Sequence, residues 1–388
     1  MKSIFKKSFA FILAAVMVLS LAACGGYTAD NTEFVIGVSG PLTGPAAVYG
    51  TAVKNSAQMA VDEINAAGGL GGVNFKLVVT DDVHDATKVA ANYASMLEGG
   101  MQVSLGTVTT APGLEYTKLS KEDNVFFLTP SASGDKIPEF DNGFQMCFAD
   151  SNQGAAAAEQ VNKTYKNQTI GVFYKSDDPY SKGIFDKFKE TLDSSITLVE
   201  TVFTGEASDF STQINTLKDC KFIFMPIYYQ PASIFMTQAK NIIAPDAVYY
   251  GCDGFDGLAG QFEDFSVIPQ EVSMLSHFDS SATEGDAATF IQKYTEKFGA
   301  DTLNQFGASA YDCVYAIYNA MKAAVDAGEK IDVTISASDL SDILKAQFAG
   351  DFTYSGVTGT NIKWQDNGYV EKGAVKYVLK TANAADEK

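Results

Sequence analysis

Short apolar stretches alternate with amphipathic stretches along most of the chain from residue 33 onward. Residues 34–39 (FVIGVS) have the length of a buried strand. Residues 53–67 place their apolar side chains on one helical face, and Gly68-Gly69 ends that helix. Further strands are expected at 75–80, 102–105 and 125–128, with helices between them. This alternation predicts a parallel sheet with helices on both faces.

The alternation begins again after residue 150. Strands are expected at 169–174, 196–202, 222–226 and 247–250, again separated by helices. Between about 283 and 347 three long amphipathic helices follow with hardly a strand, and 360–379 is predicted to be a hairpin turning at Asn367-Gly368. We therefore expect an α/β protein of two doubly wound lobes, each with a central parallel sheet.

The first residues have the pattern of an export signal. Three lysines (Lys2, Lys6 and Lys7) precede a run of 13 apolar residues at 9–21, which is too short to span a membrane comfortably. The end of the run, at 21–24 (LAAC), resembles the lipobox of bacterial lipoproteins. The resemblance implies that 1–23 are a signal peptide and that Cys24 carries a lipid. The alternative is an ordinary signal with a chance cysteine.

A lipid at Cys24 would set the location of the protein. Residues 24–32 are polar enough to be a short tether, and no later stretch reaches the roughly 20 apolar residues of a spanning helix. The folded part is therefore expected outside the cytoplasmic membrane, in contact with the membrane through the lipid anchor only.

The charge of the chain restricts the classes of partner that it can bind. The net charge is −19, and the first 23 residues carry three lysines and no acid, so their removal leaves −22. Such a protein is expected to repel nucleic acid and anionic lipid headgroups. All 28 basic residues are lysines, because the sequence contains no arginine. A ligand carboxylate would therefore be bound by hydroxyls, backbone N–H groups and helix N-termini instead of a guanidinium fork.

The sequence offers little material for catalysis or for a cofactor. His84 and His277 are the only histidines, and there is no Cys-x-x-Cys, His-Glu-x-x-His or Gly-x-Ser-x-Gly motif. The adjacent pair Asp81-Asp82 is interpreted as a solvated strand end in preference to a metal site. No enzyme activity, cofactor or metal is predicted. Three disulfide pairings are possible among the four remaining cysteines, but buried free thiols are expected at Cys147, Cys220, Cys252 and Cys313.

The loops that follow the predicted strands carry the candidate chemistry. In open α/β sheets, ligands bind beyond the carboxyl ends of the strands. Hydroxyl side chains gather in the loops of the first half of the chain, and aromatic residues and one acid gather in those of the second half. The loops concerned are 40–44, 106–110, 129–133, 178–181, 228–229 and 251–254.

From about residue 33 to 380 the sequence resembles the branched-chain amino-acid binding proteins of ABC importers. The phrases that carry the resemblance are 36–44 (IGVSGPLTG), 62–69 (DEINAAGG), 129–133 (TPSAS) and 307–312 (GASAYD). It implies the type I periplasmic-binding fold, with a hinge of three strands crossing near 148–150, 276–279 and 356–360. Lobe 1 would comprise 33–149 and 279–356, lobe 2 would comprise 150–278 and 357–380, and 381–388 would be a tail.

The same resemblance implies ligand contacts at individual positions. Thr110 matches a hydroxyl donor to the ligand carboxylate, Ser131 a position that uses backbone groups, and Ser133 a hydroxyl that bridges carboxylate and ammonium. Asp253 matches an acid, usually glutamate, that accepts from the ammonium, and Tyr228 a hydroxyl of the second lobe. The walls of the side-chain pocket would be Tyr49, Val108, Tyr180 and Phe306.

Two departures from the family pattern affect these expectations. Asp253 is one methylene shorter than glutamate, which leaves a plain leucine or isoleucine preference open. Some members carry a disulfide near the cleft of the first lobe, where this chain places His84 and Thr109, so no disulfide is expected there.

Several residues also have simpler interpretations. Thr109, Thr110, Ser131 and Ser133 could cap helices, Asp253 could be a turn residue, and the tyrosines could be surface aromatics at loop edges. Three functions fit the sequence. The leading one is capture of a free amino acid, with an apolar or aromatic side chain, for an ABC permease. The alternatives are a ligand-sensing receptor for an amide or urea-like solute and an exported enzyme of small metabolites.

Overall fold

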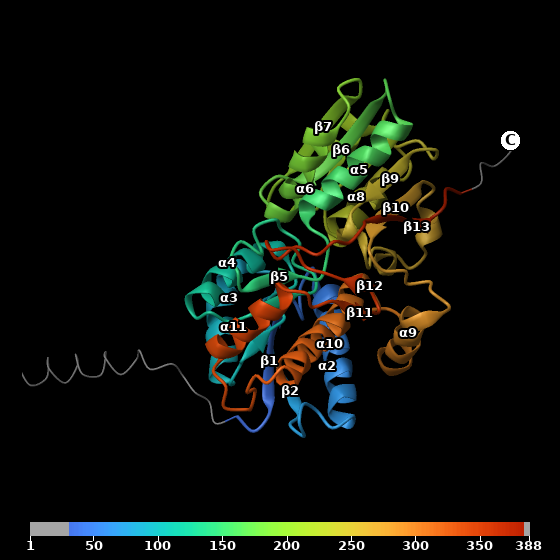
Figure 1. The fold of residues 1–388 in the computed structure, drawn as a ribbon. Helices are drawn as coiled ribbons and strands as arrows, with labels where there is room; N and C mark the ends of the chain where they lie inside the picture. The colour runs from blue at the N-terminus through green and yellow to red at the C-terminus, as the bar shows by residue number, and fades with distance from the viewer. Residues whose placement is uncertain (1–30, 384–388) are drawn as a thin grey trace, which may run out of the picture.

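The computed structural model describes residues 31–383. They form two α/β lobes, each built around its own sheet (Figure 1), as the sequence predicted. Within these residues no helix is long and apolar enough to cross a membrane. Cys24 lies outside the described residues.

The first lobe contains a five-stranded sheet in the order β2-β1-β3-β4-β5, with every pair of neighbours parallel. Strand β1 is buried along its whole length, as expected for a strand covered on both faces. The strands are β1 (Phe34–Gly40), β2 (Phe75–Asp81), β3 (Val103–Ser104), β4 (Phe127–Thr129) and β5 (Gly143–Gln145).

The helices of the first lobe come from both halves of the sequence. They are α2 (Ala47–Ala66), the short 3₁₀ helix η2 (Ala86–Lys88), α3 (Val89–Glu98), α4 (Thr110–Glu122), α9 (Gly285–Phe298), α10 (Gln305–Asp326) and α11 (Ala337–Phe348). Helix α10 packs along α2 (Figure 1). At Gly307 a Cβ atom would come within 2.9 Å of the Ser56 hydroxyl, so glycine permits the close approach of the two helices.

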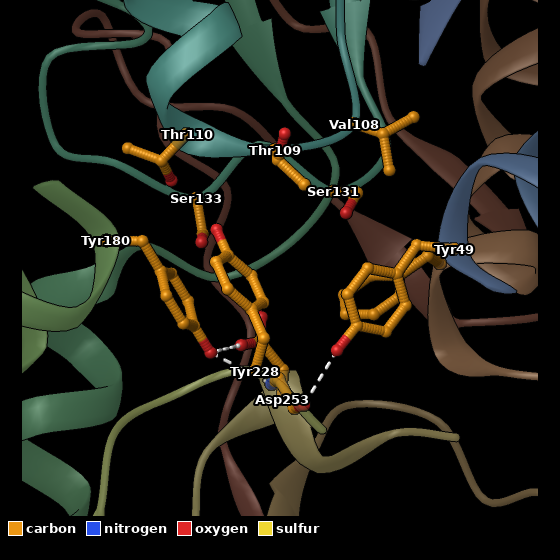
Figure 2. Close-up of a pocket in the computed structure, with 11 residues that line it drawn as sticks. Tyr49, Val108, Thr109, Thr110, Ser131, Ser133, Tyr180, Tyr228 and Asp253 are labelled. Carbon is orange, nitrogen blue, oxygen red and sulfur yellow. Dashed lines mark hydrogen bonds between the residues drawn. The ribbon is translucent and has the colours of Figure 1, made fainter. Parts of the chain in front are cut away.

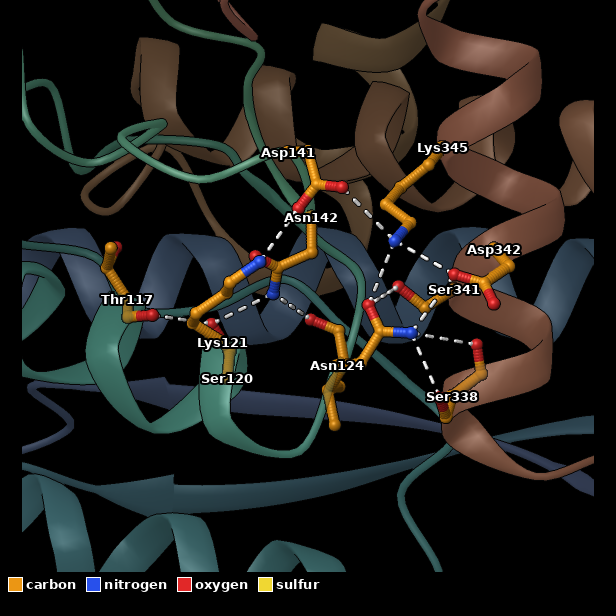
Figure 3. A network of polar contacts seen from close by, with 11 residues as sticks. Thr117, Ser120, Lys121, Asn124, Asp141, Asn142, Ser338, Ser341, Asp342 and Lys345 are labelled. Carbon is orange, nitrogen blue, oxygen red and sulfur yellow. Dashed lines mark hydrogen bonds and ion pairs between the residues drawn. The ribbon is translucent and has the colours of Figure 1, made fainter.

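A polar network fastens α11 to the turn after α4 (Figure 3). The Lys345 ammonium of α11 donates to the Asn124 side-chain oxygen at 3.0 Å and lies 2.8 Å from Asp342 and 3.3 Å from Asp141. The Asn124 amide donates in turn to the Ser338 hydroxyl at 2.9 Å. A helix from late in the sequence thus becomes part of the first lobe.

The second lobe contains a six-stranded sheet in the order β13-β10-β9-β8-β6-β7. It is parallel except at its edge, where β13 pairs antiparallel with β10. The strands are β6 (Thr169–Lys175), β7 (Thr197–Phe203), β8 (Phe222–Met225), β9 (Val248–Gly251), β10 (Glu271–Ser276) and β13 (Val375–Lys380).

The helices that cover the second sheet have at most 15 residues each. They are α5 (Asp150–Thr164), α6 (Pro179–Thr191), α7 (Ser211–Leu217) and α8 (Tyr229–Ala239), with the short 3₁₀ helices η3 (Asp253–Phe255), η4 (Ala259–Gln261) and η5 (Phe265–Val267). Helix α5 packs closely on α6. A Cβ at Gly154 would lie 2.4 Å from the Ile184 carbonyl oxygen, so the contact requires glycine.

The predicted hairpin at 360–379 is only partly correct. Its turn is present, because Gly368 has φ +79° and Trp364 pairs with Val370. The strand beyond the turn, however, does not return to residue 360. It becomes β13 on the open edge of β10, where Tyr377 and Leu379 pack against the core. The strands β11 (Tyr354–Gly356) and β12 (Gly359–Ile362) form a separate small hairpin.

Three segments of chain join the two sheets, at 146–149, 277–284 and 363–374. The Phe148 ring of the first segment stands edge-on to the His277 ring of the second, with centroids 5.0 Å apart. In the third, the Trp364 indole donates to the Gln145 carbonyl oxygen of β5 at 2.8 Å. The lobe boundaries expected at 149/150, 278/279 and 356/357 stay predictions.

A buried carboxylate anchors the hairpin of β11 and β12, which directly precedes the third segment. Asp312 of α10 accepts from the Tyr354 hydroxyl at 2.9 Å and from the backbone N–H groups of Val357 and Thr358 at 2.9 and 2.7 Å. The Thr358 hydroxyl also donates to Asp312, and Lys372 donates to that hydroxyl, each at 2.6 Å. Burial lowers the pKa of Lys372 to about 8. Charged groups therefore brace the joint between the lobes.

Candidate functional site

One cavity between the lobes collects every residue that the sequence singled out for ligand binding (Figure 2). We call it the central cavity. Its predicted lining residues are Tyr49, Val108, Thr110, Ser131, Ser133, Tyr180, Tyr228, Asp253 and Phe306. Thr109 and Gly254 line it as well and were not among the predicted contacts. The geometry brings these residues together, and their roles toward a ligand stay predictions.

The first lobe supplies a wall of hydroxyl groups from the loops after β3 and β4. Thr110 begins α4, and its hydroxyl oxygen accepts from the Gly134 N–H at 3.2 Å. Ser131 and Ser133 are buried in the loop after β4, at a distance from any helix start. The helix-cap interpretation therefore does not account for either serine. Thr109 occupies the position before α4 without making a side-chain cap hydrogen bond.

The start of α4 adds a partial positive charge to the same wall. The first N–H groups of a helix have no partner within the helix, and the helix dipole favours an anion beside them. Pro112 fits this first turn because it removes an N–H that the helix does not use. Hydroxyls and a helix N-terminus together suit a carboxylate.

The second lobe supplies a single buried acid opposite the hydroxyls. Asp253 begins η3 directly after β9 and is 1% exposed. One of its carboxylate oxygens accepts from the Tyr180 hydroxyl at 2.6 Å, and its backbone N–H donates to Gln153 at 2.9 Å. Its other oxygen, Oδ2, is buried without a partner among residues 31–383.

Burial raises the pKa of Asp253 to about 7, although hydrogen bonds from Tyr180 and Gln153 oppose the shift, and the nearby charge of Asp256 adds to it. A carboxylate desolvated in this way favours a cationic partner. Among the residues that the structure describes, no lysine lines the central cavity, so this part of the chain supplies no counter-charge there.

Three tyrosines close the cavity from the sides. The Tyr49 hydroxyl donates across the gap between the lobes to the Gly254 carbonyl oxygen at 2.6 Å. The Tyr228 ring stacks on Tyr180 with centroids 4.5 Å apart, and Phe306 meets Tyr49 edge-on at 4.9 Å. These rings are buried or half-buried, so the interpretation as surface aromatics is wrong.

His84 and Thr109 meet where some relatives were expected to have a disulfide. The His84 Nδ1 atom lies 2.9 Å from the Thr109 hydroxyl oxygen. Burial lowers the pKa of His84 to about 4, so the ring is neutral near pH 7. The prediction of buried free thiols at Cys147, Cys220, Cys252 and Cys313 is confirmed.

The carboxylates of Asp81 and Asp82 accept hydrogen bonds from different parts of the chain. Asp81 accepts from the Leu42 N–H and the Thr43 hydroxyl, while Asp82 accepts from the Ser39 hydroxyl and the His84 N–H. Asp81 is half-buried and Asp82 is fully buried, so the interpretation of the pair as a solvated strand end is wrong for Asp82. In the described part of the chain, no three potential ligands cluster as a metal site.

Sequence reasoning missed a second buried acid behind the hydroxyl wall. Asp150 opens α5, its N–H donates to the Ser133 carbonyl oxygen at 2.8 Å, and its Oδ1 atom has no partner among the described residues. Burial raises the pKa of this carboxyl well above its usual range. The only signal in the sequence was its position as the last residue of the expected first crossing, 148–150.

Comparison with known proteins gives a consistent result. The periplasmic binding protein family matches residues 33–377. A Leu/Ile/Val-binding protein of Rhizobium johnstonii is 30% identical over 358 residues, which are 89% of this chain and 93% of that protein. A leucine-, isoleucine-, valine-, threonine- and alanine-binding protein of Pseudomonas aeruginosa is 27% identical over 61% of this chain and 64% of its own length.

Solved structures agree with the fold. A leucine-binding protein of Thermotoga maritima superposes with a TM-score of 0.76 at 21% identity, covering 90% of this chain and 96% of that one. A branched-chain amino-acid transporter substrate-binding protein of Streptococcus pneumoniae, solved with isoleucine, gives a TM-score of 0.74 at 25% identity, covering 89% of this chain and all of that one. The chain belongs to the periplasmic binding protein family, as a substrate-binding protein of the Leu/Ile/Val-binding type.

Proposed function

We propose that the protein captures a free amino acid outside the cytoplasmic membrane and delivers it to an ABC importer. The observation that carries the proposal is the polarity of the central cavity. One wall presents Thr110, Ser133 and the start of α4, and the opposite wall presents the unpaired oxygen of Asp253. A zwitterion taken into such a cleft has both of its charges met, which offsets the cost of removing them from water.

The two walls belong to different lobes, so the ligand itself bridges them. Thr110 is placed by the first sheet and Asp253 by the second. A ligand that contacts both walls binds the closed arrangement better than an open one and shifts the population toward closure. Tyr49 already spans the gap through its hydrogen bond to Gly254, which adds to the closed state.

The receptor for an amide or urea-like solute is less well supported, because neither solute offers a cation to Asp253. Catalysis is no part of the proposal: the described residues that line the central cavity include no activated nucleophile with a base beside it. The decisive experiment is mass spectrometry of the small molecule released from freshly purified mature protein, followed by a thermal-shift panel of amino acids, amides and urea. A co-purified amino acid that raises the melting temperature supports the proposal. An amide or urea that does so alone refutes it.

Membrane attachment through a lipid on Cys24 is part of the same proposal. Cys24→Ser is expected to release the protein into the soluble extracytoplasmic fraction, because the sulfur that would carry the lipid is gone and no described helix can span the membrane. Cell fractionation with immunoblotting measures this. If the serine variant stays with the membrane fraction as fully as the wild type, the lipid anchor is not what holds the protein.

Amino-acid affinity is expected to fall as the pH drops below about 7. The empty site has an Asp253 with a pKa of about 7, and only its ionised form can pair with an ammonium. Binding therefore releases a proton below that pH, and the dissociation constant should rise by up to about tenfold per pH unit. Calorimetry from pH 5.5 to 8.5 measures the slope. Asp253→Asn should bind weakly with little dependence on pH, and a flat profile for the wild type would contradict this role of Asp253.

Thr110→Val is expected to weaken amino-acid binding by about 1.5–3 kcal/mol, the value of a hydrogen bond to a charged group. Valine keeps the shape of threonine but lacks its hydroxyl. Thr117→Val on the same helix is the matched control, because its buried hydroxyl donates to the Ile137 carbonyl oxygen and does not line the central cavity. Equal losses in both variants would show that the effect comes from α4 as a whole.

A further inference from the structure

A second cavity lies beside the central cavity and shares Tyr228 with it. We call it the side cavity. Its volume is about 240 Å³, against about 10 Å³ for the central cavity. Both lobes contribute to it: His84 comes from the loop after β2, and Lys175, Phe203, Pro231 and Ile234 come from the second lobe.

The central cavity as it stands has space for little more than one water molecule. An amino acid bound between its polar walls therefore needs more room than the central cavity offers, and a side chain larger than a methyl group adds most to that need. The side cavity adjoins it and offers that room. Of the residues described, Tyr228 alone is common to the linings of both.

Tyr228 is the least restrained of the three tyrosines around the central cavity. The hydroxyls of Tyr49 and Tyr180 are hydrogen-bonded to Gly254 and Asp253, respectively. The Tyr228 hydroxyl is buried and has no partner among the residues described. Its ring is held by stacking on Tyr180 and by an edge contact with His84 at 5.1 Å. Turning this ring aside breaks no hydrogen bond.

The walls of the side cavity define the kind of side chain that it suits. Phe203, Pro231 and Ile234 provide apolar surface. His84 is neutral near pH 7 because burial lowers its pKa to about 4. Lys175 lines this cavity, and within residues 31–383 its ammonium pairs only with Glu206, at 3.4 Å, where Glu206 is largely exposed and lines the cavity as well. An aromatic ring buries much apolar area and is also attracted to an ammonium group.

We infer that the side cavity is a second subsite, which receives the side chain of an aromatic amino acid whose charged groups occupy the central cavity. Tyr228 is the movable partition between the two. The inference rests on the proposed function, because the charged groups of the ligand must first be fixed between Thr110 and Asp253. It narrows the side chain expected from the sequence, which was apolar or aromatic, to an aromatic one, and it adds a residue that controls access to the subsite.

The test is to fill the side cavity and compare a large with a small amino acid. Ile234 lies in α8 and lines the side cavity, so Ile234→Trp places a larger side chain there and reduces the space. Ile242→Trp is the matched control, because Ile242 is 48% exposed and lines neither cavity. Calorimetry with phenylalanine and alanine is run on the mature wild type and both variants. Ile234→Trp is expected to weaken phenylalanine binding at least about tenfold and to change alanine binding less than about twofold.

Each outcome separates the inference from the function on which it rests. A wild type that binds alanine but not phenylalanine overturns the subsite and leaves the proposed function intact. Equal weakening of both ligands, or no weakening of phenylalanine, also overturns the subsite. A wild type that binds no amino acid refutes the proposed function and the subsite with it. If Ile234→Trp does not fold, Ala207→Phe fills the side cavity from the loop after β7 and is measured in the same way.

Discussion

Asp253→Ala is expected to weaken amino-acid binding by about 2–5 kcal/mol, or roughly 30- to 4,000-fold. The variant leaves the ligand ammonium desolvated without its counter-charge, because Asp253 is the single acid among the described residues that line the central cavity. Isothermal titration calorimetry at pH 8, where Asp253 is ionised, measures the full effect.

Two further variants separate charge from shape. Asp253→Asn keeps the size of the side chain and can still accept from the Tyr180 hydroxyl, yet it should lose most of the affinity. Asp82→Asn removes another buried acid whose pKa burial raises to about 6, but Asp82 does not line the cavity, so its affinity should stay near that of the wild type. Wild-type affinity in Asp253→Ala would remove Asp253 from the binding site.

Asp312→Ala is expected to lower the free energy of unfolding by about 3–5 kcal/mol. The carboxylate accepts four hydrogen bonds at the joint between the lobes, and two of the donors are backbone N–H groups of Val357 and Thr358 that would be left buried without partners. Lys372 would also lose the charge that supports its buried ammonium.

The Asp312 effect is measured by urea unfolding of the mature protein, followed by circular dichroism. Asp326→Ala on the same helix is the control, because its ion pair with Lys322 is exposed and should contribute about 0.5 kcal/mol or less. If the urea concentration at the midpoint of unfolding is the same for Asp312→Ala as for Asp326→Ala, the hydrogen bonds at this joint do not stabilise the fold.

Much of the architecture could be predicted from local patterns. Apolar runs of strand length and amphipathic runs of helix length identify the two α/β lobes, because parallel strands buried on both faces are continuously apolar, as in β1. The candidate site followed from the same pattern. Loops at the carboxyl ends of parallel strands converge, so hydroxyls near Thr110 and Ser131 had to face the acid after β9 if the lobes closed.

Long-range pairing could not be predicted in the same way. The strand β13 was expected to fold back on residue 360, but it pairs with β10 from more than a hundred positions earlier in the chain. A hairpin turn at Gly368 is a local signal, whereas the open edge that accepts the next strand is set by the whole sheet. Strands β5 and β10 themselves were missed, and β5 has only three residues.

The sequence also did not show which buried polar groups would have hydrogen-bond partners. Nothing in the pattern around Asp150 shows that its side chain is buried with an unpaired oxygen, or that the hydroxyl of Tyr228 lacks a partner while those of Tyr49 and Tyr180 have one. These properties depend on which groups the folded lobes bring together. They are also the properties that indicate where a ligand or a moving side chain is needed.

The central claim is that both charges of a zwitterion are bound, one by each lobe. The most direct measurement is calorimetry of the mature protein with leucine, with 4-methylpentanoate, which lacks the ammonium, and with 3-methylbutylamine, which lacks the carboxylate. If another amino acid co-purifies, its own analogues replace these. Both analogues are predicted to bind at least about 100-fold more weakly than the amino acid, because each leaves one buried group of the cavity unpaired. Binding of either analogue as tight as that of the amino acid would contradict the claim.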